Sequence, residues 1–554
     1  MKKTLLTLLA LIVILSISTG SVFAKDVNDQ IKDLNKRLQK LELKSNKSKI
    51  LWSGDLRVEA HSITGETANS VDGMSLQNLT VNSLFAVGNG LVGLPTTPAE
   101  AGSFVSDVNQ AIASNPAEYM AFMNGLTFDQ LGQMMSGFTP DQQAGLMALL
   151  GPAATYLPAQ KVDNSLLYTT RLRLNMDAKV AKNVSFAGRL SMYKPWGAST
   201  QVGMFNGQAN TLAMDANEPG VPGSTTLKVE RAYFTWSKIA DKPVYLSLGR
   251  RPSTNGPPMH YRHDESRAGT PMGTIIDFQF DGATLGYNLT DKTTIRACYG
   301  LGYESQYGNG TLGQDNDTVL KDASFFGFNI DAWNTPDMQI QTTVARAFNI
   351  TDGFNGYVIM PNNPVTGAAM PGPIVTRFSP SVNLGDFDLA SLLLARKDGP
   401  VDWFLTGSWS KSKPIEGVTT PFGGMFADPF APVEEQTGSM YYVGARYNFN
   451  NDKTKLGVEY NHGSQYWFNF SPSQDDIIGP KTSTRGTVWE TYVTHRINRK
   501  FVMKVAFINY DYDYSGSGWH LGEPKDLNAD TAPILGYPTY KKASKISLGF
   551  SARF

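Results

Sequence analysis

The sequence predicts an all-β membrane protein, an antiparallel transmembrane β-barrel of about 16 strands. Segments of roughly 10–14 residues are apolar on one face and polar on the other, which is typical of strands between lipid and an aqueous lumen. Short turns and long loops alternate strictly between these segments. The chain also contains 52 Gly, 23 Tyr, 29 Phe and 9 Trp at a mean hydropathy of −0.24. This combination favours strands with one apolar face over a helix bundle.

Composition excludes several functional classes. The 554 residues include 49 Lys+Arg and 49 Asp+Glu, and this balance argues against a nucleic-acid-binding protein. The single cysteine, Cys298, excludes a disulfide framework, a zinc ribbon and an iron–sulfur cluster. The chain has no nucleophile elbow, phosphate loop or dinucleotide fingerprint. We therefore expect neither a cofactor nor enzymatic activity.

Residues 1–24 have the pattern of an export signal. Lys2 and Lys3 precede an apolar run, and Val22-Phe23-Ala24 offers small residues at the positions that a signal peptidase reads, so we expect cleavage after Ala24. Residues 25–49 then carry a heptad pattern formed by Val27, Ile31, Leu34, Leu38 and Leu41. Two heptads need support from an oligomer, so the segment is interpreted as a short periplasmic coiled coil. The alternative is an amphipathic helix packed on its own domain.

The expected barrel occupies residues 50–554. Its strands are expected at 51–60, 166–178, 183–194, 226–237, 243–250, 275–289, 292–302, 322–332, 337–349, 382–395, 401–411, 439–449, 454–463, 486–496, 499–511 and 544–554. Short connections such as Lys182-Asn183 and Asp398-Gly399 join them in pairs. Outer-membrane barrels keep short turns on the periplasmic side and long loops outside, which orients the chain.

Aromatic residues near strand ends suggest the girdles of a membrane barrel; they are Trp52, Tyr193, Trp196, Trp236, Tyr299, Tyr303, Trp403, Trp409 and Trp489. Phe554 ends an alternating strand and resembles the C-terminal insertion signature of bacterial outer-membrane barrels. With its coiled-coil leader, paired strands and the segment Gly249-Arg250-Arg251-Pro252-Ser253-Thr254, the chain resembles Gram-negative porins and a domain-of-unknown-function family of outer-membrane porins. The resemblance implies residence in outer-membrane lipid, insertion by the barrel-assembly machinery through Phe554, and a homotrimer.

An insertion at 61–160 interrupts the first long loop. Helix starts are indicated at Thr97-Pro98, Asn115-Pro116, Thr127 and Thr139-Pro140, where a capping side chain is followed by an acidic residue or glutamine in the first turn. The insertion contains no Lys or Arg but does contain Glu66, Asp72, Glu100, Asp107, Glu118, Asp129 and Asp141. It is either an extracellular cap or a plug whose acids meet lumen arginines.

Alternation directs many charged side chains into the lumen: Arg171, Arg173, Asp177, Arg189, Arg231, Asp277, Asp281, Arg296, Arg446, Glu459, Glu490, Arg496, Lys504 and Arg553. The third long loop, 251–273, starts after Arg250 and contains Arg251, Arg262 and Arg267. Its prolines would stiffen it, and porins commonly fold this loop inward, so it is the expected constriction. His260 and His263 in this loop have no helix to set metal geometry, and no metal site is predicted.

These features predict a passive porin for small hydrophilic solutes, with an anion preference set by lumen Arg and Lys side chains. Alternatively, the arginines pair with lumen carboxylates and only hold the wall together. A second functional hypothesis is a barrel that sheaths a partner such as a multihaem cytochrome conduit. A hydrolase would need a Ser–His pair on the outer wall, which the sequence does not indicate.

Overall fold

The computed structural model describes residues 34–37, 50–125, 139, 156–197, 220, 222–223, 225–305, 320–352, 355–358, 374–377, 382–418, 424–428, 431–449, 452–472, 475–515, 521–529, 534–536 and 539–554. Two compact units are found, Met1–Leu51 and Trp52–Phe554. In the first unit, residues 34–37 are helical. The export signal, its cleavage site and the rest of the coiled-coil segment lie outside the described residues. The cleavage and the trimer stay predictions.

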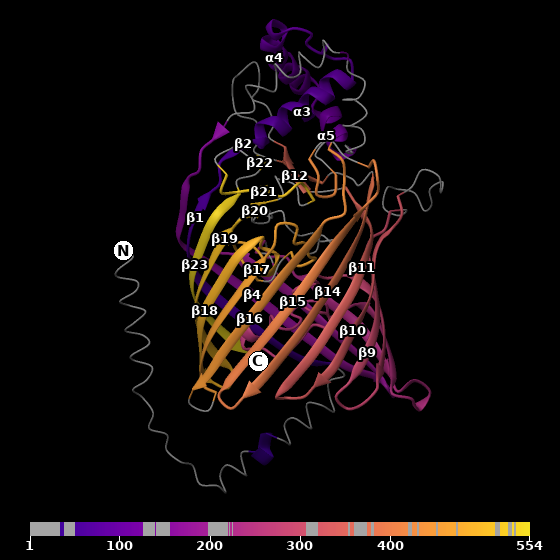
Figure 1. Ribbon diagram of the computed structural model, residues 1–554, viewed down its shortest axis with the longest axis vertical. Coiled ribbons are helices and arrows are strands. Elements are labelled where there is room, and N and C mark those ends of the chain that lie inside the picture. The colour runs from indigo at the N-terminus through magenta and orange to yellow at the C-terminus, as the bar shows by residue number, and fades with distance from the viewer. Residues whose placement is uncertain are drawn as a thin grey trace. The chain divides into compact units, whose positions relative to one another are not determined.

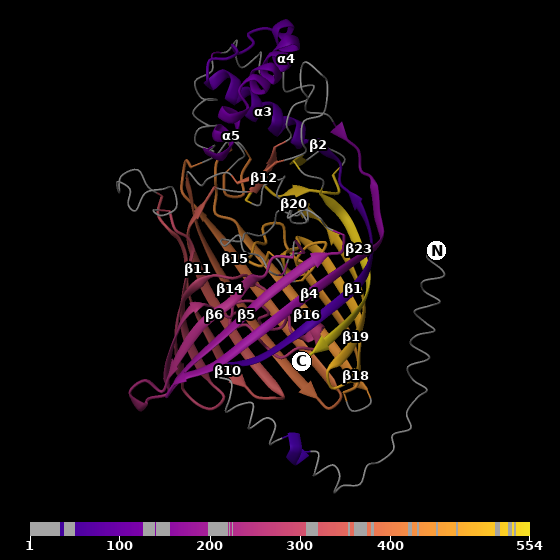
Figure 2. The same cartoon turned by 180° about the vertical axis from the view of Figure 1, so that it is seen from behind.

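The second unit contains a closed antiparallel barrel of 16 strands, which confirms the predicted fold class (Figures 1 and 2). Consecutive barrel strands are neighbours, and the first also pairs with the last, so the sheet has no free edge. The strands are β1(Leu51–Thr67), β4(Lys161–Ala181), β5(Val184–Pro195), β6(Lys228–Ser237), β7(Val244–Arg250), β8(Asp281–Asn288), β9(Thr294–Tyr303), β10(Ala323–Asn334), β11(Met338–Thr351), β14(Asn383–Asp398), β15(Val401–Pro414), β16(Thr437–Phe449), β17(Thr454–Gly463), β18(Gly486–Asn498), β19(Phe501–Tyr512) and β23(Tyr540–Arg553).

Several predicted strand boundaries are wrong. β1 continues to Thr67, past its predicted end at residue 60 and into the predicted insertion at 61–160. β8 begins at Asp281, whereas the alternation had suggested residue 275. Phe278 and Phe280 alternate with polar neighbours as a strand would, but they pack inside the barrel instead of pairing along its wall. Hydrophobic alternation cannot distinguish a wall strand from an extended segment lying against the inner wall.

The outer wall carries an apolar belt between two charged rows. On β14, Ala390, Leu392 and Leu394 separate outward-facing Asp388 from Arg396, and Leu392 is 57% exposed. Trp236, Trp409 and Trp489 are also exposed on this face, as expected for residues at a lipid boundary. Tyr193, which was expected in the girdle, instead faces the lumen and is 3% exposed, with the Arg57 guanidinium 5.6 Å from its ring centroid.

The insertion contains three described helices: α3(Gly73–Gly88), α4(Pro98–Ser114) and α5(Pro116–Gly125). The starts of α4 and α5 fall at the two expected prolines. The Thr97 hydroxyl accepts a hydrogen bond from the Glu100 amide, while the Glu100 carboxylate accepts one from the Thr96 amide at 2.8 Å. α3 was not among the predicted helices. The expected starts at Thr127 and Thr139-Pro140 fall on segments that lie outside the described residues, apart from Thr139 itself.

α3, α4 and α5 pack around Phe85, Phe104, Val108 and Tyr119, which form a separate apolar core. A small sheet of β2(Ser70–Asp72), β3(Tyr156–Leu157) and β22(Ile534–Gly536) brings both ends of the insertion together with the last long loop. Two further pairs lie in the long loops: β12(Asn355–Val358) with β13(Ile374–Arg377), and β20(Tyr514–Ser515) with β21(Lys525–Asp526). No helix within the described part of the chain is long and apolar enough to cross a bilayer.

The apolar belt predicts a depth-dependent response to charge. Leu392 lies midway along the belt, and Ile497 lies beside the short turn after β18. Leu392→Arg should destabilise the folded barrel in lipid by about 2–4 kcal/mol, and Ile497→Arg by about 0–1 kcal/mol. Urea unfolding in phospholipid vesicles measures both. Equal effects of the two substitutions would contradict this placement of the membrane.

Candidate functional site

Two long loops fold into the lumen. Loop 3 is defined as residues 251–280 and loop 7 as residues 464–485. They meet inside the barrel, where the Asp277 amide donates to the Phe470 carbonyl and the Phe470 amide donates to the Ile275 carbonyl, both at 2.9 Å. The Thr274 hydroxyl of loop 3 lies 3.0 Å from the hydroxyls of Ser391 on β14 and Ser408 on β15. The structure thus places loop 3 inside the barrel and adds loop 7, which the sequence did not indicate.

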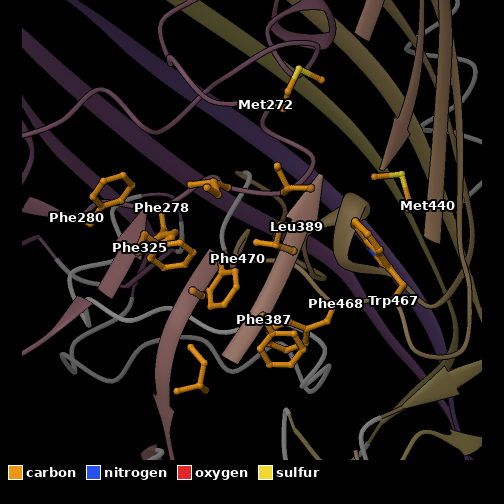
Figure 3. Close-up of a cluster of buried hydrophobic side chains, with 14 of the residues drawn as sticks. Met272, Phe278, Phe280, Phe325, Phe387, Leu389, Met440, Trp467, Phe468 and Phe470 are labelled. Carbon is orange, nitrogen blue, oxygen red and sulfur yellow. The ribbon is translucent and has the colours of Figure 1, made fainter. Parts of the chain in front are cut away.

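One half of the lumen is filled by an apolar cluster. Loop 3 contributes Met272, Ile275, Ile276, Phe278 and Phe280, and loop 7 contributes Trp467, Phe468 and Phe470. They pack against inward-facing side chains of β10, β14 and β15, among them Phe325, Phe387, Leu389 and Phe404 (Figure 3). A Cβ on Gly300 would lie 2.1 Å from the Phe280 ring, so a glycine is required there. At the level of this cluster, this side of the inner wall is therefore apolar.

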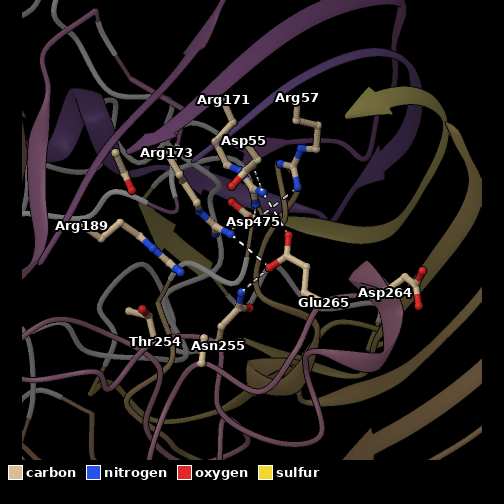
Figure 4. Close-up of polar contacts among 12 residues, drawn as sticks. Asp55, Arg57, Arg171, Arg173, Arg189, Thr254, Asn255, Asp264, Glu265 and Asp475 are labelled. Atoms are coloured by element: carbon tan, nitrogen blue, oxygen red, sulfur yellow. Dashed lines mark hydrogen bonds and ion pairs between the residues drawn. The ribbon is translucent and has the colours of Figure 1, made fainter. Parts of the chain in front are cut away.

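The other half carries a row of arginines, which we call the basic wall. It consists of Arg57 on β1, Arg171 and Arg173 on β4, Arg189 on β5 and Arg231 on β6 (Figure 4 shows the first four). Arg171 is 2% exposed and Arg173 6%. A register shift between β5 and β6 occurs at Arg189/Leu190, and both Glu230 and Arg231 are buried beside it.

Carboxylates from the wall and from both loops meet these arginines. Glu230 lies 3.0 Å from Arg189 and 3.4 Å from Arg231. Glu265 of loop 3 lies 3.2 Å from Arg171 and 3.3 Å from Arg173, and Asp55 of β1 lies 2.9 Å from Arg171. Arg231 also donates to the Thr254 carbonyl at 2.9 Å and so holds the start of loop 3 against the wall.

Asp475 of loop 7 contacts three of the guanidiniums, those of Arg57, Arg171 and Arg173. Burial alone would raise the pKa of this carboxyl, but the guanidiniums hold it well below its usual range. Asp277 of loop 3 shows the opposite case. Its burial raises its pKa to about 8, although a hydrogen bond from the Asn255 amide opposes this.

A second ionic network holds the two loops to β17 and β18. Arg262 of loop 3 lies 2.8 Å from Asp476 of loop 7 and 2.8 Å from Glu490. Lys481 of loop 7 lies 2.8 Å from Glu459 and 3.0 Å from Glu490 and is fully buried. Lys504 adds a third cation near Glu490 at 3.4 Å.

Most of the remaining predicted lumen cations are paired with carboxylates as well. Arg267 and Arg296 share Asp331, at 2.9 and 2.8 Å. Arg446 pairs with Asp402 at 2.7 Å, and Arg496 lies 3.4 Å from Asp264. Arg251 differs, because it donates to the Ser247 and Thr284 hydroxyls and its guanidinium lies 5.0 Å from the centroid of the Tyr233 ring. The pairing that the sequence left open as an alternative is the arrangement observed.

Arg250 and Asp281 do not face the lumen, which corrects their expected placement. The two residues are register partners on neighbouring strands, and Arg250 Nη2 lies 3.1 Å from Asp281 Oδ2. They are on the face that also carries exposed Leu285 and Tyr287. Gly249, at φ 116°, precedes Arg250, and the chain then turns inward so that Arg251 points into the lumen. A one-residue offset of this kind exchanges the two faces of a strand.

Two small cavities border loop 3. A polar cavity of about 20 Å³ is lined by Arg57, Glu59, His263, Glu265, Thr494, Val502, Lys504, Gly549, Ser551 and Arg553. It has room for about one water molecule. An apolar cavity of about 40 Å³ lies between the start of loop 3 and β8–β11, and Cys298 is among its lining residues.

No group of three or more His, Cys, Asp or Glu in the described ranges could hold a metal ion. His260 and His263 are both on loop 3, and the desolvation caused by their burial lowers the pKa of each imidazole. Phe554 follows β23, where its backbone exchanges two hydrogen bonds of 3.0 Å with Gly54, and its side chain is 55% exposed. Its role in barrel insertion stays a prediction.

Sequence reasoning missed Arg57, Glu230, Asp475 and Lys481. Arg57 lies on a strand that was correctly predicted, and strict alternation from Asp55 would have found it. Glu230 was hidden by the shift in register between β5 and β6. Asp475 and Lys481 belong to loop 7, whose mixture of aromatic and charged residues has no periodicity that would indicate burial.

The architecture is that of a closed 16-stranded β-barrel with two long loops folded into its lumen. The model of a family described as "Protein of unknown function (DUF3373)" matches residues 161–554, and the chain belongs to this family. No curated protein matches the chain.

Several solved structures are similar in fold. The anion-selective porin from Comamonas acidovorans is 9% identical, with 91% of this chain and 99% of that chain covered at a TM-score of 0.42. OprB of Pseudomonas putida is 9% identical, with coverages of 93% and 96% and a TM-score of 0.39. OmpT, an outer membrane protein of Vibrio cholerae, is 11% identical, with coverages of 70% and 89% and a TM-score of 0.36. Similarity at this level says nothing about the solute.

The buried network around Lys481 predicts a large cost for its removal. Lys481→Met leaves Glu459 with two tyrosine hydroxyls, those of Tyr442 and Tyr492, and with no cation in contact among the described residues. We expect the barrel to lose about 3–5 kcal/mol of stability, because an uncompensated charge stays buried. The loss is measured as a lower temperature at which the band on a gel shifts from the folded to the unfolded position.

Lys525→Met is the matched control. Lys525 pairs with Asp428 in the long loops, where the two side chains are 24% and 47% exposed. Its removal should cost less than about 1 kcal/mol. A loss at Lys481 no greater than at Lys525 would show that loop 7 is not held by this network.

Proposed function

We propose that the chain is an outer-membrane channel through which small hydrophilic solutes, and anions in preference to cations, diffuse passively. The barrel supplies a route across the membrane. The apolar cluster closes one half of its lumen, so solutes would cross through the half lined by the basic wall. Loops 3 and 7 narrow this route to the polar cavity, which has room for about one water molecule, so a solute would pass only where these loops shift.

The charge of the basic wall is the observation that carries the anion preference. Its five arginines face three carboxylates from the wall itself, Asp55, Glu59 and Glu230, which leaves a net charge of 5 − 3 = +2. Glu265 and Asp475, which the loops supply, bring this sum to zero. With the loops in place the charges balance, so an anion on the route would have to displace these loop acids from the guanidiniums.

The cytochrome sheath is the weaker hypothesis. A sheathed partner would have to occupy the lumen, and loops 3 and 7 pack there against each other and against the wall. A sheath would first require both loops to leave, with the loss of the Arg262–Asp476 and Lys481–Glu459 pairs. No observation on this chain favours that rearrangement.

The homotrimer also stays a proposal. Exposed apolar side chains on the outer wall, such as Leu285 and Leu405, can face either lipid or a neighbouring barrel. The leader at 25–49 would add a coiled-coil contact if it trimerises. Chemical cross-linking of the detergent-solubilised protein, with and without residues 25–49, tests this; a monomer in both samples would reject it.

The channel is tested by its conductance in a planar bilayer under a KCl gradient. We expect stepwise currents. The reversal potential should have the sign that results when chloride crosses more readily than potassium. Lys504 and Arg553 line the polar cavity, and replacing both with Gln should shift the reversal potential towards zero, because two lumen cations are lost.

Lys411→Gln serves as the control, since Lys411 lies on the outer face of β15, where it pairs with Glu435. The reversal potential of this variant should equal that of the unmodified chain. A folded barrel that gives no current would refute the channel. Current with no anion preference, or an equal shift in the control, would refute the role of the lumen cations.

A further inference from the structure

Three guanidiniums of the basic wall converge on one loop carboxylate, that of Asp475. The Asp475 Oδ2 atom lies 3.4 Å from Arg57 Nη1 and 3.2 Å from Arg173 Nη2, and it also accepts a hydrogen bond from Arg171 Nη1. Asp475 comes from loop 7, whereas the arginines come from β1 and β4 (Figure 4). The side chains of Asp475, Arg57 and Arg171 are 4%, 8% and 2% exposed.

The fit between this carboxylate and the arginines is incomplete. The second carboxylate oxygen, Asp475 Oδ1, is buried and has no hydrogen-bond partner within the described residues. The same is true of Arg57 Nη2. Buried polar atoms are normally satisfied, so a donor and an acceptor left open at one site indicate a pocket that Asp475 fills imperfectly. Asp475 also has a φ of 62°, a left-handed conformation that few non-glycine residues adopt.

We propose that Arg57, Arg171 and Arg173 form a binding site for the carboxylate group of a solute, and that Asp475 occupies this site as a tethered substitute. The inference rests on the proposed channel and names its class of solute. A free carboxylate is not restricted by the loop backbone, so its two oxygens can reach Arg171 and Arg173 on one side and Arg57 on the other. Planar guanidiniums recognise carboxylates through such paired hydrogen bonds.

Asp475→Ala tests the site, with acetate as the probe. The substitution removes one carboxylate and leaves space of the size of that group beside three guanidiniums. We expect acetate to raise the temperature of the folded-to-unfolded gel shift for this variant in a saturable manner. At ten times its dissociation constant, acetate should change the folding equilibrium about 11-fold. Sodium chloride at matched ionic strength should give no saturable increase.

Three controls separate the site from a general salt effect. In the unmodified chain and in Asp475→Asn the site is filled by a side chain, so acetate should have no saturable effect. Asp428→Ala removes a loop acid that pairs with Lys525 and not with an arginine of the basic wall. This variant should not respond to acetate either. An absent acetate effect in Asp475→Ala, or the same effect in all four proteins, would overturn the proposal. A response to phosphate but not to acetate would overturn the carboxylate class.

If Asp475→Ala folds poorly, the yield of heat-modifiable barrel refolded with and without acetate provides the same test. Acetate-dependent recovery supports the site, and equal yields overturn it. This readout requires no current, so it is independent of the channel. Acetate binding without conductance would refute the channel and leave the binding site intact. Conductance without acetate binding would refute the binding site and leave the channel intact.

Discussion

The structure depends on the need to pair charges that a closed barrel places in a nearly dry interior. Arg57, Arg171, Arg173, Arg189 and Arg231 stand side by side on four strands, and five neighbouring cations repel one another unless carboxylates separate them. The wall supplies only part of the required negative charge. The rest comes from Glu265 and Asp475, so the basic wall can be neutral only if loops 3 and 7 enter the lumen.

The same two loops account for the apolar half. Once inside, they place Phe278 and Phe470 against Phe325 and bury the inward faces of β10, β14 and β15. Loops 3 and 7 therefore pack aromatic side chains against β10, β14 and β15 and form ion pairs with the basic wall. Burial of several aromatic side chains is a large favourable term, and the ion pairs specify where each loop lies rather than adding much net stability. The consequence is a lumen that apolar side chains close on one side and that the basic wall lines on the other.

The sequence was sufficient to predict the barrel but not the arrangement of the loops that fill its lumen. Alternation and short turns located all the wall strands, because a lipid-facing side chain at every second position is a strict physical requirement. Thr97-Pro98 and Asn115-Pro116 located two helices through capping chemistry that is entirely local. By contrast, Arg250 was counted among the pore residues because it starts the third loop, but the chain turns at Gly249, which leaves Arg250 on the outer face and points Arg251 inward. Loop 7 was missed because its burial results from contacts with residues hundreds of positions away, such as Asp475 with Arg171.

The central claim is that any aqueous route follows the charged half and avoids the apolar half. The single cysteine, Cys298, lines the apolar cavity, while Ser551 lines the polar one. Single-channel current should be measured during exposure to a small anionic thiol reagent, for the unmodified chain and for Ser551→Cys in a Cys298→Ser background. The account predicts that current falls in the Ser551→Cys variant and is unchanged in the chain with Cys298. Block through Cys298, with no effect at position 551, would place the route on the opposite side of the lumen and contradict the account.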